Sequence, residues 1–232
     1  MDLRRTLREL GHDLLALVWP TECVNCGRAD RDCCDPCLAE VRAHSPPIER
    51  DVGLTCFAAT TYDGAVRALL VALKHAGRMG FARVLGPRLR APLAEAMGRV
   101  EGPQAPIIAT APSRASRVRQ RGYRHVDLLV TAALRGQRLR VLRFRALKAR
   151  RGRSAQVGLD AAERERNARR IAVRRGLRTL ISGREVIIVD DVVTTGATLR
   201  AAREALESAG AAVVAAVVLC DVVRWDGKSD QI

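Results

Sequence analysis

The clearest chemical pattern in the sequence is the run from residue 185 to residue 198, which reads Glu-Val-Ile-Ile-Val-Asp-Asp-Val-Val-Thr-Thr-Gly-Ala-Thr. Its β-branched residues at 186–189 predict a strand buried on both faces, and Asp190 and Asp191 follow this strand directly. In open parallel α/β sheets, ligands bind beyond the carboxyl ends of the strands. Two adjacent carboxylates at such an edge suit sugar hydroxyls, or a magnesium ion with its water shell. We therefore predict that Asp190 and Asp191 are catalytic residues.

A phosphate-binding loop is predicted directly after the two acids, at Thr194, Thr195, Gly196, Ala197 and Thr198. The glycine lets the backbone approach an anion closely, and the hydroxyls and the amides of a following helix can surround a phosphate. The alternative is that Asp190 only caps this helix and that the threonines only form a turn. A strand, paired acids, a loop with hydroxyls and glycine, and a helix in this order are more specific than a lone Thr-Thr-Gly. The combination favours a phosphorylated sugar as the ligand.

A basic loop is predicted at the same edge of the sheet. Residues 107–111 predict a short buried strand, and residues 112–124 after it contain five arginines. A solvated loop explains most of these arginines, and we expect only two or three of them to contact a ligand. The best candidates are Arg119, Arg121 and Gly122. Two further residues attract notice. Lys74 could reach a phosphate, although the ordinary explanation is a cation at a helix C-terminus, and His125 lies beside the basic loop.

Five of the seven cysteines gather near the N-terminus. The Cys-x-x-Cys turns Cys23–Cys26 and Cys34–Cys37 can each point two sulfurs at one centre, and together they predict a tetrahedral zinc site. Cys33 could replace Cys34 in a shifted register, and a redox role is a less favoured alternative. Because four cysteines leave no open coordination position, the zinc would be structural. Cys56 and Cys220 lie in apolar runs and are expected in the core.

Apolar strands alternate with helices along the rest of the chain. Strands are expected at 54–61, 107–111, 139–147, 186–189 and 212–219, and helices at 64–74, 80–97, 126–134, 160–169 and 199–208. This alternation predicts an α/β fold with a parallel sheet flanked by helices. We divide the chain into two parts. Residues 1–47 hold an N-terminal helix (3–19) and the zinc-binding module, and residues 48–232 form the α/β domain.

The 232 residues carry a formal net charge of +15, and 48% of them are hydrophobic. No apolar run approaches the roughly 20 residues that cross a bilayer, and the first residues lack the features of a secretory signal. We therefore expect a cytoplasmic protein without membrane insertion. Residues 114–153 hold 13 arginines and Lys148 against a single acid, Asp127, so this segment carries nearly all of the net charge. Such a local excess predicts an anionic partner.

The run at 185–198 resembles the phosphoribosyl-pyrophosphate (PRPP) signature of type I phosphoribosyltransferases. The order of motifs along the chain is similar to that of the ComF/GntX family of phosphoribosyltransferase-like competence proteins. This order comprises two Cys-x-x-Cys pairs, Arg121-Gly122-Tyr123, then Gln156, Leu159, Arg164 and Asn167, and then the signature. The resemblance implies a type I phosphoribosyltransferase-like sheet. It places Asp190 and Asp191 on the ribose hydroxyls and residues 194–198 on the 5-phosphate.

The same resemblance assigns the pyrophosphate of PRPP to the basic loop, with Arg119, Arg121 and Gly122 as its contacts. It also favours Cys34 over Cys33 as the zinc ligand. The chain departs from the family at residues 124 and 125, which are arginine and histidine where the family usually has asparagine and glutamine.

Two classes of function follow from the sequence. The first is a PRPP- and magnesium-dependent phosphoribosyltransferase that the resemblance links to DNA uptake. Positioning of the substrates and stabilisation of charge would accelerate its displacement step, so no covalent nucleophile is required. The second is a non-enzymatic factor for DNA-uptake assembly, or a PRPP-sensing module. This second class would bind single-stranded DNA or a helicase partner such as a DNA-uptake ATPase.

Overall fold

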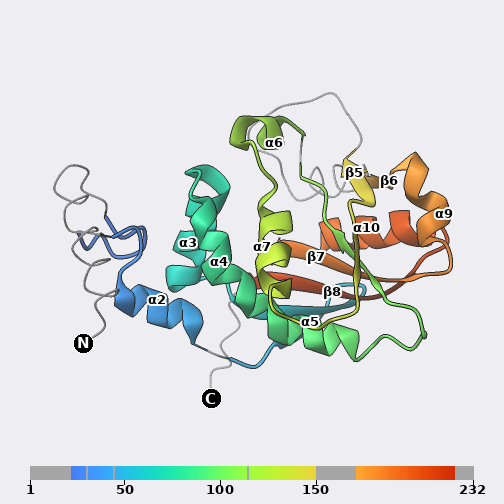
Figure 1. Cartoon of the computed structure of the whole chain (residues 1–232), viewed down its shortest axis with the longest axis horizontal. Helices are drawn as coiled ribbons and strands as arrows, with labels where there is room; N and C mark the ends of the chain where they lie inside the picture. The colour runs from blue at the N-terminus through green and yellow to red at the C-terminus, as the bar shows by residue number, and fades with distance from the viewer. Residues whose placement is uncertain (1–21, 30, 44, 114, 150–170, 223–232) are drawn as a thin grey trace, which may run out of the picture.

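The computed structural model describes residues 22–29, 31–43, 45–113, 115–149 and 171–222. Figure 1 shows their arrangement around a central sheet. In chain order the elements are α2 (Asp35–Arg42), β1 (Ile48–Asp51), β2 (Thr55–Thr61), α3 (Gly64–His75), η1 (Met79–Phe81), α4 (Ala82–Leu85), η2 (Gly86–Leu89), α5 (Arg90–Met97), β3 (Ile107–Thr110), α6 (Ala115–Arg121), α7 (His125–Leu134), β4 (Leu142–Phe144), β5 (Leu147–Ala149), β6 (Ile171–Val173), η3 (Arg175–Leu177), α9 (Arg178–Ile181), β7 (Glu185–Val193), α10 (Ala197–Glu207) and β8 (Ala212–Asp221).

The main sheet has six strands in the order β1-β2-β8-β7-β3-β4. All of its neighbouring pairs are parallel except β1 with β2, which is antiparallel. A short antiparallel pair, β5 with β6, lies outside this sheet. After β3 the chain continues to β4 on one side, whereas after β7 it continues to β8 on the other side. The carboxyl ends of β3 and β7 therefore form the topological switch point where ligands bind in such sheets.

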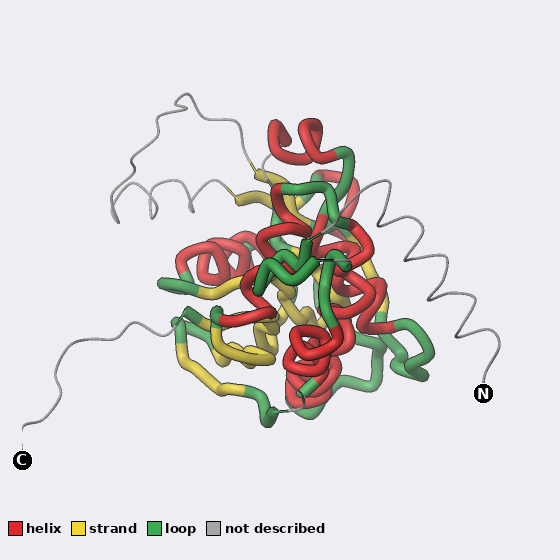
Figure 2. Tube along the Cα trace, turned by 90° about the vertical axis from the view of Figure 1, so that its left-hand side faces the viewer, coloured by secondary structure: helices red, strands yellow, loops and turns green. Residues whose placement is uncertain are grey.

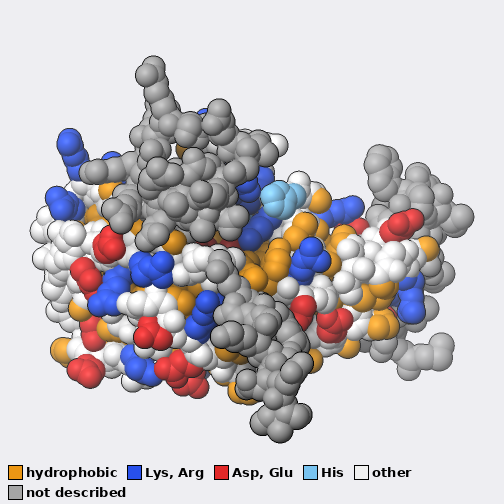
Figure 3. Space-filling model, turned by 180° about the vertical axis from the view of Figure 1, so that it is seen from behind, with side chains coloured by type: hydrophobic (Ala, Val, Ile, Leu, Met, Phe, Trp, Pro, Cys, Tyr) orange, Lys and Arg blue, Asp and Glu red, His pale blue; other side chains and the backbone are white. Residues whose placement is uncertain are grey.

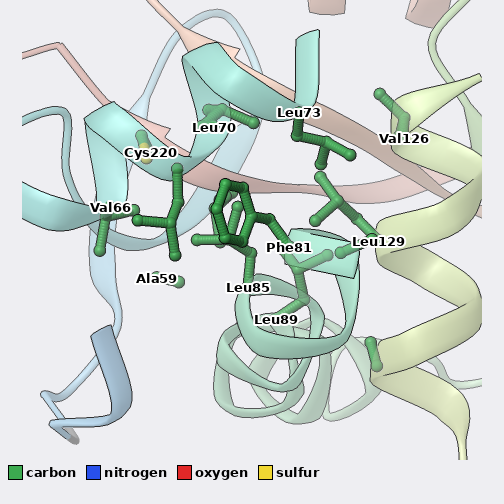
Figure 4. Close-up of a cluster of buried hydrophobic side chains, with 14 of the residues drawn as sticks. Ala59, Val66, Leu70, Leu73, Phe81, Leu85, Leu89, Val126, Leu129 and Cys220 are labelled. Carbon is green, nitrogen blue, oxygen red and sulfur yellow. The ribbon is translucent and has the colours of Figure 1, made fainter. Parts of the chain in front are cut away.

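Each face of the sheet is covered by a separate hydrophobic cluster. On one face, α2, α3, α4, η2, α5 and α7 pack against Phe57, Ile187 and Val217. Leu70, Leu85 and Leu129 in this cluster are fully buried (Figure 4). On the other face, α10, α9 and the β5–β6 pair pack against Ile107, Ile188 and Val218. Figure 2 shows the strands enclosed between the helices. The sheet thus has the buried parallel strands that the apolar runs predicted.

Several predicted elements differ in detail from the observed ones. The helix expected at 80–97 is broken into α-helical and 3-10 segments around Gly86-Pro87, where α7 packs closely. A Cβ atom on Gly86 would lie 2.5 Å from that of Ala132, so this contact requires glycine. The strand predicted at 186–189 extends to Val193, and the basic loop contains helix α6. The strand predicted at 139–147 is two strands, β4 and β5.

Other predictions lie wholly or mostly outside the described residues. They are the helices at 3–19 and 160–169 and the motif residues Gln156, Leu159, Arg164 and Asn167. Among the described residues, no helix has both the length and the apolar character needed to cross a membrane.

Candidate functional site

Asp190 and Asp191 lie at the switch point, as the sequence predicted. Thr110, the last residue of β3, pairs with Val189, so the two acids extend β7 just beyond the end of β3. Successive side chains in a strand point to opposite faces of the sheet. Asp191 consequently points toward α3 and α7, where it contacts Lys74 and His125. The two carboxylates therefore have different surroundings.

Asp191 is held by two basic side chains. Its Oδ2 lies 3.0 Å from Nζ of Lys74, and it also bonds Nε2 of His125. The side chains of Asp191 and His125 are only 12% and 8% exposed. Burial alone would raise the pKa of Asp191, but the hydrogen bond from His125 and the charge of Lys74 lower this pKa to about 2. Asp191 is therefore a carboxylate at physiological pH, with Lys74 as its counter-ion.

Asp190 is in the opposite situation. Burial, followed by the charge of Asp191, raises its pKa to about 7. Its Oδ1 accepts a hydrogen bond from the backbone N–H of Asp191 at 2.8 Å. Its Oδ2 has no hydrogen-bond partner among the residues that the structure describes. Among the described residues, Asp190 therefore has no basic partner, whereas Asp191 has two.

The predicted phosphate loop connects β7 to α10. Gly196 precedes α10 in the left-handed conformation, with φ of 74°. A Cβ atom at this position would lie 2.5 Å from Cβ of Val52, so only glycine fits. Arg200 donates hydrogen bonds to the carbonyls of Thr195 and Val52, at 2.8 and 3.1 Å, and thereby anchors the loop. Thr194 and Thr198 are exposed, so their hydroxyls are open to a ligand beside the first amides of α10.

The basic loop reaches the same site, but its predicted residues differ in their contacts. Arg119 is exposed on α6, and Gly122 ends that helix with φ of 78°. The guanidinium of Arg121 donates to the carbonyls of Arg117 and Lys74, at 3.1 and 3.3 Å, and lies 3.0 Å from Nδ1 of His125. Arg121 thus links the end of α3 to His125.

Lys74 and His125 lie at the site but were not among the predicted site residues. Lys74 belongs to the last turn of α3, and its position there looked sufficient to explain a cation. His125 begins α7 and is buried. Its place after the Arg-Gly-Tyr motif was the only signal that singled it out. Figure 3 shows Lys and Arg side chains gathered next to a histidine on one face of the molecule.

The four predicted cysteine ligands form a separate cluster. The Sγ atoms of Cys23, Cys26, Cys34 and Cys37 all lie within 4.8 Å of one another. Cys34 is the N-cap of α2 and Cys37 lies in its first turn, so this helix orients two of the four sulfurs. Burial raises the pKa of the Cys23 thiol, but backbone N–H groups of Cys26, Cys34 and Asn25 lower it to about 6. The cluster is compatible with a metal ion bound by thiolates.

Cys33 is oriented differently from its neighbour. Its sulfur lies 3.8 Å from the carbonyl oxygen of Cys34 and does not belong to the four-sulfur cluster. Burial, followed by the charges of Cys23 and Cys34, raises the pKa of the Cys33 thiol to about 11. Cys34 rather than Cys33 therefore completes the cluster.

Part of the chain is similar to phosphoribosyl transferases. Residues 147–230 match the family described as "Phosphoribosyl transferase domain". The chain is 45% identical to the orotate phosphoribosyltransferase of Rhizorhabdus wittichii over 74 residues. This stretch covers 32% of this chain and 36% of that protein. It is 50% identical to the adenine phosphoribosyltransferase of Kineococcus radiotolerans over 50 residues. This stretch covers 22% of this chain and 27% of that protein. The chain therefore spans about a third of the length of the curated relatives it matches.

Solved structures give more distant similarities. A phosphoribosyltransferase from Corynebacterium diphtheriae is 18% identical, with a TM-score of 0.37 over 70% of this chain and 71% of that one. The orotate phosphoribosyltransferase of Mycobacterium tuberculosis H37Rv, in complex with Fe(III) dicitrate, is 14% identical, with a TM-score of 0.37 over 80% and 82%. The family match and the mixed, mainly parallel sheet with flanking helices agree with the predicted fold. The chain has a phosphoribosyltransferase-like fold with four clustered cysteines near its N-terminus.

Proposed function

We propose that this protein binds PRPP together with magnesium at the switch point and acts as a phosphoribosyltransferase. Asp190 would accept hydrogen bonds from the ribose hydroxyls, and residues 194–198 would surround the 5-phosphate. Asp191 would contribute negative charge and hold Lys74 and His125 in place. The observation that carries the proposal is the Asp190 carboxylate, which has no basic partner among the described residues and lies on the strand that leads into the left-handed Gly196 loop and α10.

The basic groups at the site suit the other end of PRPP. In the proposed reaction, the bond between the anomeric carbon and the pyrophosphate oxygen breaks, and the acceptor's nucleophilic atom bonds to that carbon. Pyrophosphate leaves with the electron pair, and the charge it carries would be balanced by Arg119, Arg121 and Lys74. Turnover is tested by incubating the protein with magnesium, PRPP and a panel of nucleobases and amines, and measuring the pyrophosphate released. Binding without any release would favour a PRPP-sensing module.

Magnesium fits the oxygen donors at this site. The ion prefers carboxylate and phosphate oxygens and keeps several of its waters. The free Oδ2 of Asp190 is a donor of this kind, next to the loop proposed for phosphate. When bound, magnesium would neutralise part of the charge of the diphosphate. Asp191 is less suited as a direct ligand because Lys74 and His125 already bind its Oδ2 and the ammonium of Lys74 would repel the ion.

Replacing Gly196 by alanine should weaken PRPP binding by at least about tenfold. The new Cβ would collide with Val52, and a left-handed residue other than glycine costs roughly 1–2 kcal/mol, so the loop must move. The measurement is titration calorimetry with PRPP and magnesium. Gly136→Ala is the matched control, because Gly136 also has a positive φ, of 74°, but a Cβ there would meet no atom within 4 Å. Equal losses of affinity in the two variants would count against the loop as the phosphate site.

We also propose that the four cysteines bind a structural zinc ion. Four thiolates at about 2.3 Å from one zinc ion lie about 3.8 Å from one another. The observed sulfurs, with 3.5 Å between those of Cys26 and Cys34, have similar spacing. The described residues supply four sulfur ligands, which complete a tetrahedron. The zinc would stabilise the fold around α2 and take no part in the transfer step.

Cys34→Ser should lose most of the bound zinc, whereas Cys33→Ser should keep about one ion per chain. The reason is that Cys34 belongs to the four-sulfur cluster and Cys33 does not. Elemental analysis of the purified variants by mass spectrometry gives the zinc content directly. Loss of zinc from Cys33→Ser but not from Cys34→Ser would reverse the ligand assignment.

A link to DNA uptake is the second candidate function, and the distribution of charge favours it. Arg138, Arg140, Arg175 and Arg178 are exposed on segments away from the two acids. Surface arginines of this kind bind phosphate backbones in a salt-dependent way. Gel shifts with single-stranded DNA at increasing salt, comparing the wild type with an Arg138/Arg140 double alanine variant, test this role. A helicase partner such as a DNA-uptake ATPase would be tested by co-purification with the same two proteins.

A further inference from the structure

The N-terminus of α3 is capped by a residue of the cysteine module. The backbone N–H of Ala65, in the first turn of α3, donates to Oε1 of Glu40 at 2.8 Å. Asp63 stands at the usual N-cap position, but its carboxylate accepts from the hydroxyl of Thr61 instead. A Cβ atom on Gly64 would lie 2.1 Å from Oε1 of Glu40, so glycine is needed for the contact. Glu40 therefore supplies the cap that Asp63 does not.

Glu40 belongs to the helix that presents the cysteines. It lies in α2, the helix that Cys34 caps and that holds Cys37 in its first turn. The module is tied to the remainder of the fold at two further points. Arg78 forms an ion pair with Asp32 at 2.7 Å, and Arg88 donates to the carbonyl of Val41 at 3.0 Å. Figure 1 shows α2, α3 and α7 following one another from the cysteine module toward the sheet.

The other end of α3 is fixed at the switch point. The hydroxyl of Tyr123 donates to the carbonyl of Leu73 at 2.5 Å, and Arg121 donates to the carbonyl of Lys74. These bonds satisfy carbonyls that the end of a helix leaves unpaired. Nζ of Lys74 then contacts Asp191. Between its two ends, α3 has 12 residues and is about 18 Å long.

Lys74 has the surroundings of an anion-binding group. Its side chain is 19% exposed, and its ammonium lies 3.0 Å from Oδ2 of Asp191 at the site. The neighbouring His75 has a lowered pKa, owing first to burial and then to the positive charges of Arg117, Lys74 and Arg121. These groups form a local positive field, in which Asp191 is the acid that holds Lys74 in place. A diphosphate that enters beside Asp190 would therefore meet Lys74.

We propose that Lys74 is an anion-binding residue of the switch-point site, and that Glu40 is the positioning residue through which the cysteine module places it. Loading of the four cysteines and affinity for a diphosphate are then coupled through α3. Without a metal, nothing joins the sulfurs of the two Cys-x-x-Cys turns, and the start of α2, which supplies two of the four, loosens. Glu40 then no longer caps α3, its first turn frays, and Lys74 is held less firmly against Asp191. The proposal deepens the proposed function and rests on it.

Titration calorimetry with inorganic pyrophosphate and magnesium tests the coupling on the zinc-loaded full chain. Lys74→Ala should weaken binding at least about tenfold, the effect of losing one charged contact. Glu40→Ala should weaken it about three- to tenfold, in line with the loss of a helix cap. Glu40→Gln should bind like the wild type, because its amide oxygen still accepts from Ala65. Arg83→Ala, which removes an exposed cation from α4, is the charge control and should have no effect.

A double variant separates positioning from general damage. In the Lys74→Ala background, adding Glu40→Ala should cause little further loss, because Glu40 acts through Lys74. Glu40→Asp keeps the charge but shortens the reach, and replaces Glu40→Ala if that variant does not fold. Removal of zinc from the wild type should weaken pyrophosphate binding similarly and speed hydrogen exchange of the first amides of α3.

The outcomes distinguish a failure of the coupling from a failure of the proposed function. If the wild type binds PRPP but Glu40→Ala, Glu40→Asp and zinc removal leave pyrophosphate affinity unchanged, the coupling is wrong and the proposed function stands. Additive losses in the double variant, or no rescue by Glu40→Gln, would also overturn it. If the wild type binds neither PRPP nor pyrophosphate, the proposed function and the coupling fall together.

Discussion

Asp191→Ala is expected to lower the free energy of unfolding by about 3 kcal/mol at neutral pH. The substitution leaves Lys74 and His125 without their shared counter-ion in a largely buried position. Removing one partner of a buried ion pair typically costs 3–5 kcal/mol, and the partial exposure of Lys74 puts the expected value at the lower end. Urea denaturation, followed by circular dichroism, measures the difference.

The neighbouring acid provides the matched control for this effect. Asp190→Asn should leave the free energy of unfolding unchanged, or raise it slightly, because burial and the charge of Asp191 disfavour the Asp190 carboxylate. If the two substitutions destabilise the fold equally, Asp191 is not the anchor of the basic cluster. Equal effects would also remove the distinction between an anchoring acid and a ligand-facing acid.

Asp190→Asn should weaken the binding of magnesium and PRPP by at least about 30-fold. Loss of one charged hydrogen-bond acceptor typically costs about 2 kcal/mol, which corresponds to that factor. Asparagine keeps the size of the side chain but cannot supply a carboxylate to the metal or the ribose. Titration calorimetry of both proteins at pH 8 gives the ratio. A variant that binds PRPP as tightly as the wild type would show that Asp190 is not the ligand-facing acid.

Titration of Asp190 should make the stability of the wild type and its affinity for PRPP change in opposite directions with pH. Its pKa of about 7 in the folded state lies above the usual value for an aspartate, so the folded protein binds the extra proton between about pH 4 and pH 7. The contribution of Asp190 to stability therefore falls as the pH rises through this range. Affinity for magnesium and PRPP should rise through the same range, because binding needs the carboxylate. Asp190→Asn should lack both trends.

The parts of the site that lie next to one another in sequence were predictable. The carboxyl end of a buried parallel strand fixes where Asp190, Asp191 and Gly196 must lie, so a single run of residues was sufficient. The spacing of the Cys-x-x-Cys pairs likewise predicted a four-sulfur cluster. Gly196 was predicted to let the backbone approach an anion closely. The structure gives a second reason for glycine at this position, because a Cβ atom would collide with Val52.

The contacts between distant segments could not be predicted in the same way. A helix that follows a parallel strand usually returns along the sheet, so there was no reason to place the last turn of α3 beside Asp191. Lys74 therefore looked like an ordinary helix-end cation. Glu40 belongs to no motif in the sequence, although it caps another element 25 residues away. Such contacts depend on how α2, α3 and α7 pack, and sequence periodicity does not determine that packing.

The basic loop illustrates a third case. Its position at the ligand edge followed from the strand before it, but the role of each arginine did not. Arg121 satisfies carbonyls of α6 and α3 and contacts His125, while Arg119 remains exposed. Both remain predicted ligand contacts. The structure adds that Arg121 would act from a fixed position, whereas Arg119 would have to be ordered by the ligand.

Titration of the wild-type protein with PRPP in the presence of magnesium is the most direct test of the central claim. The account predicts saturable binding of one PRPP per chain, lost on removal of magnesium and strongly weakened in Asp190→Asn. Ribose 5-phosphate should bind more weakly, because it lacks the diphosphate that Lys74 and the basic loop would contact. Absence of any PRPP binding to folded, zinc-loaded wild type at pH 8 would contradict the account.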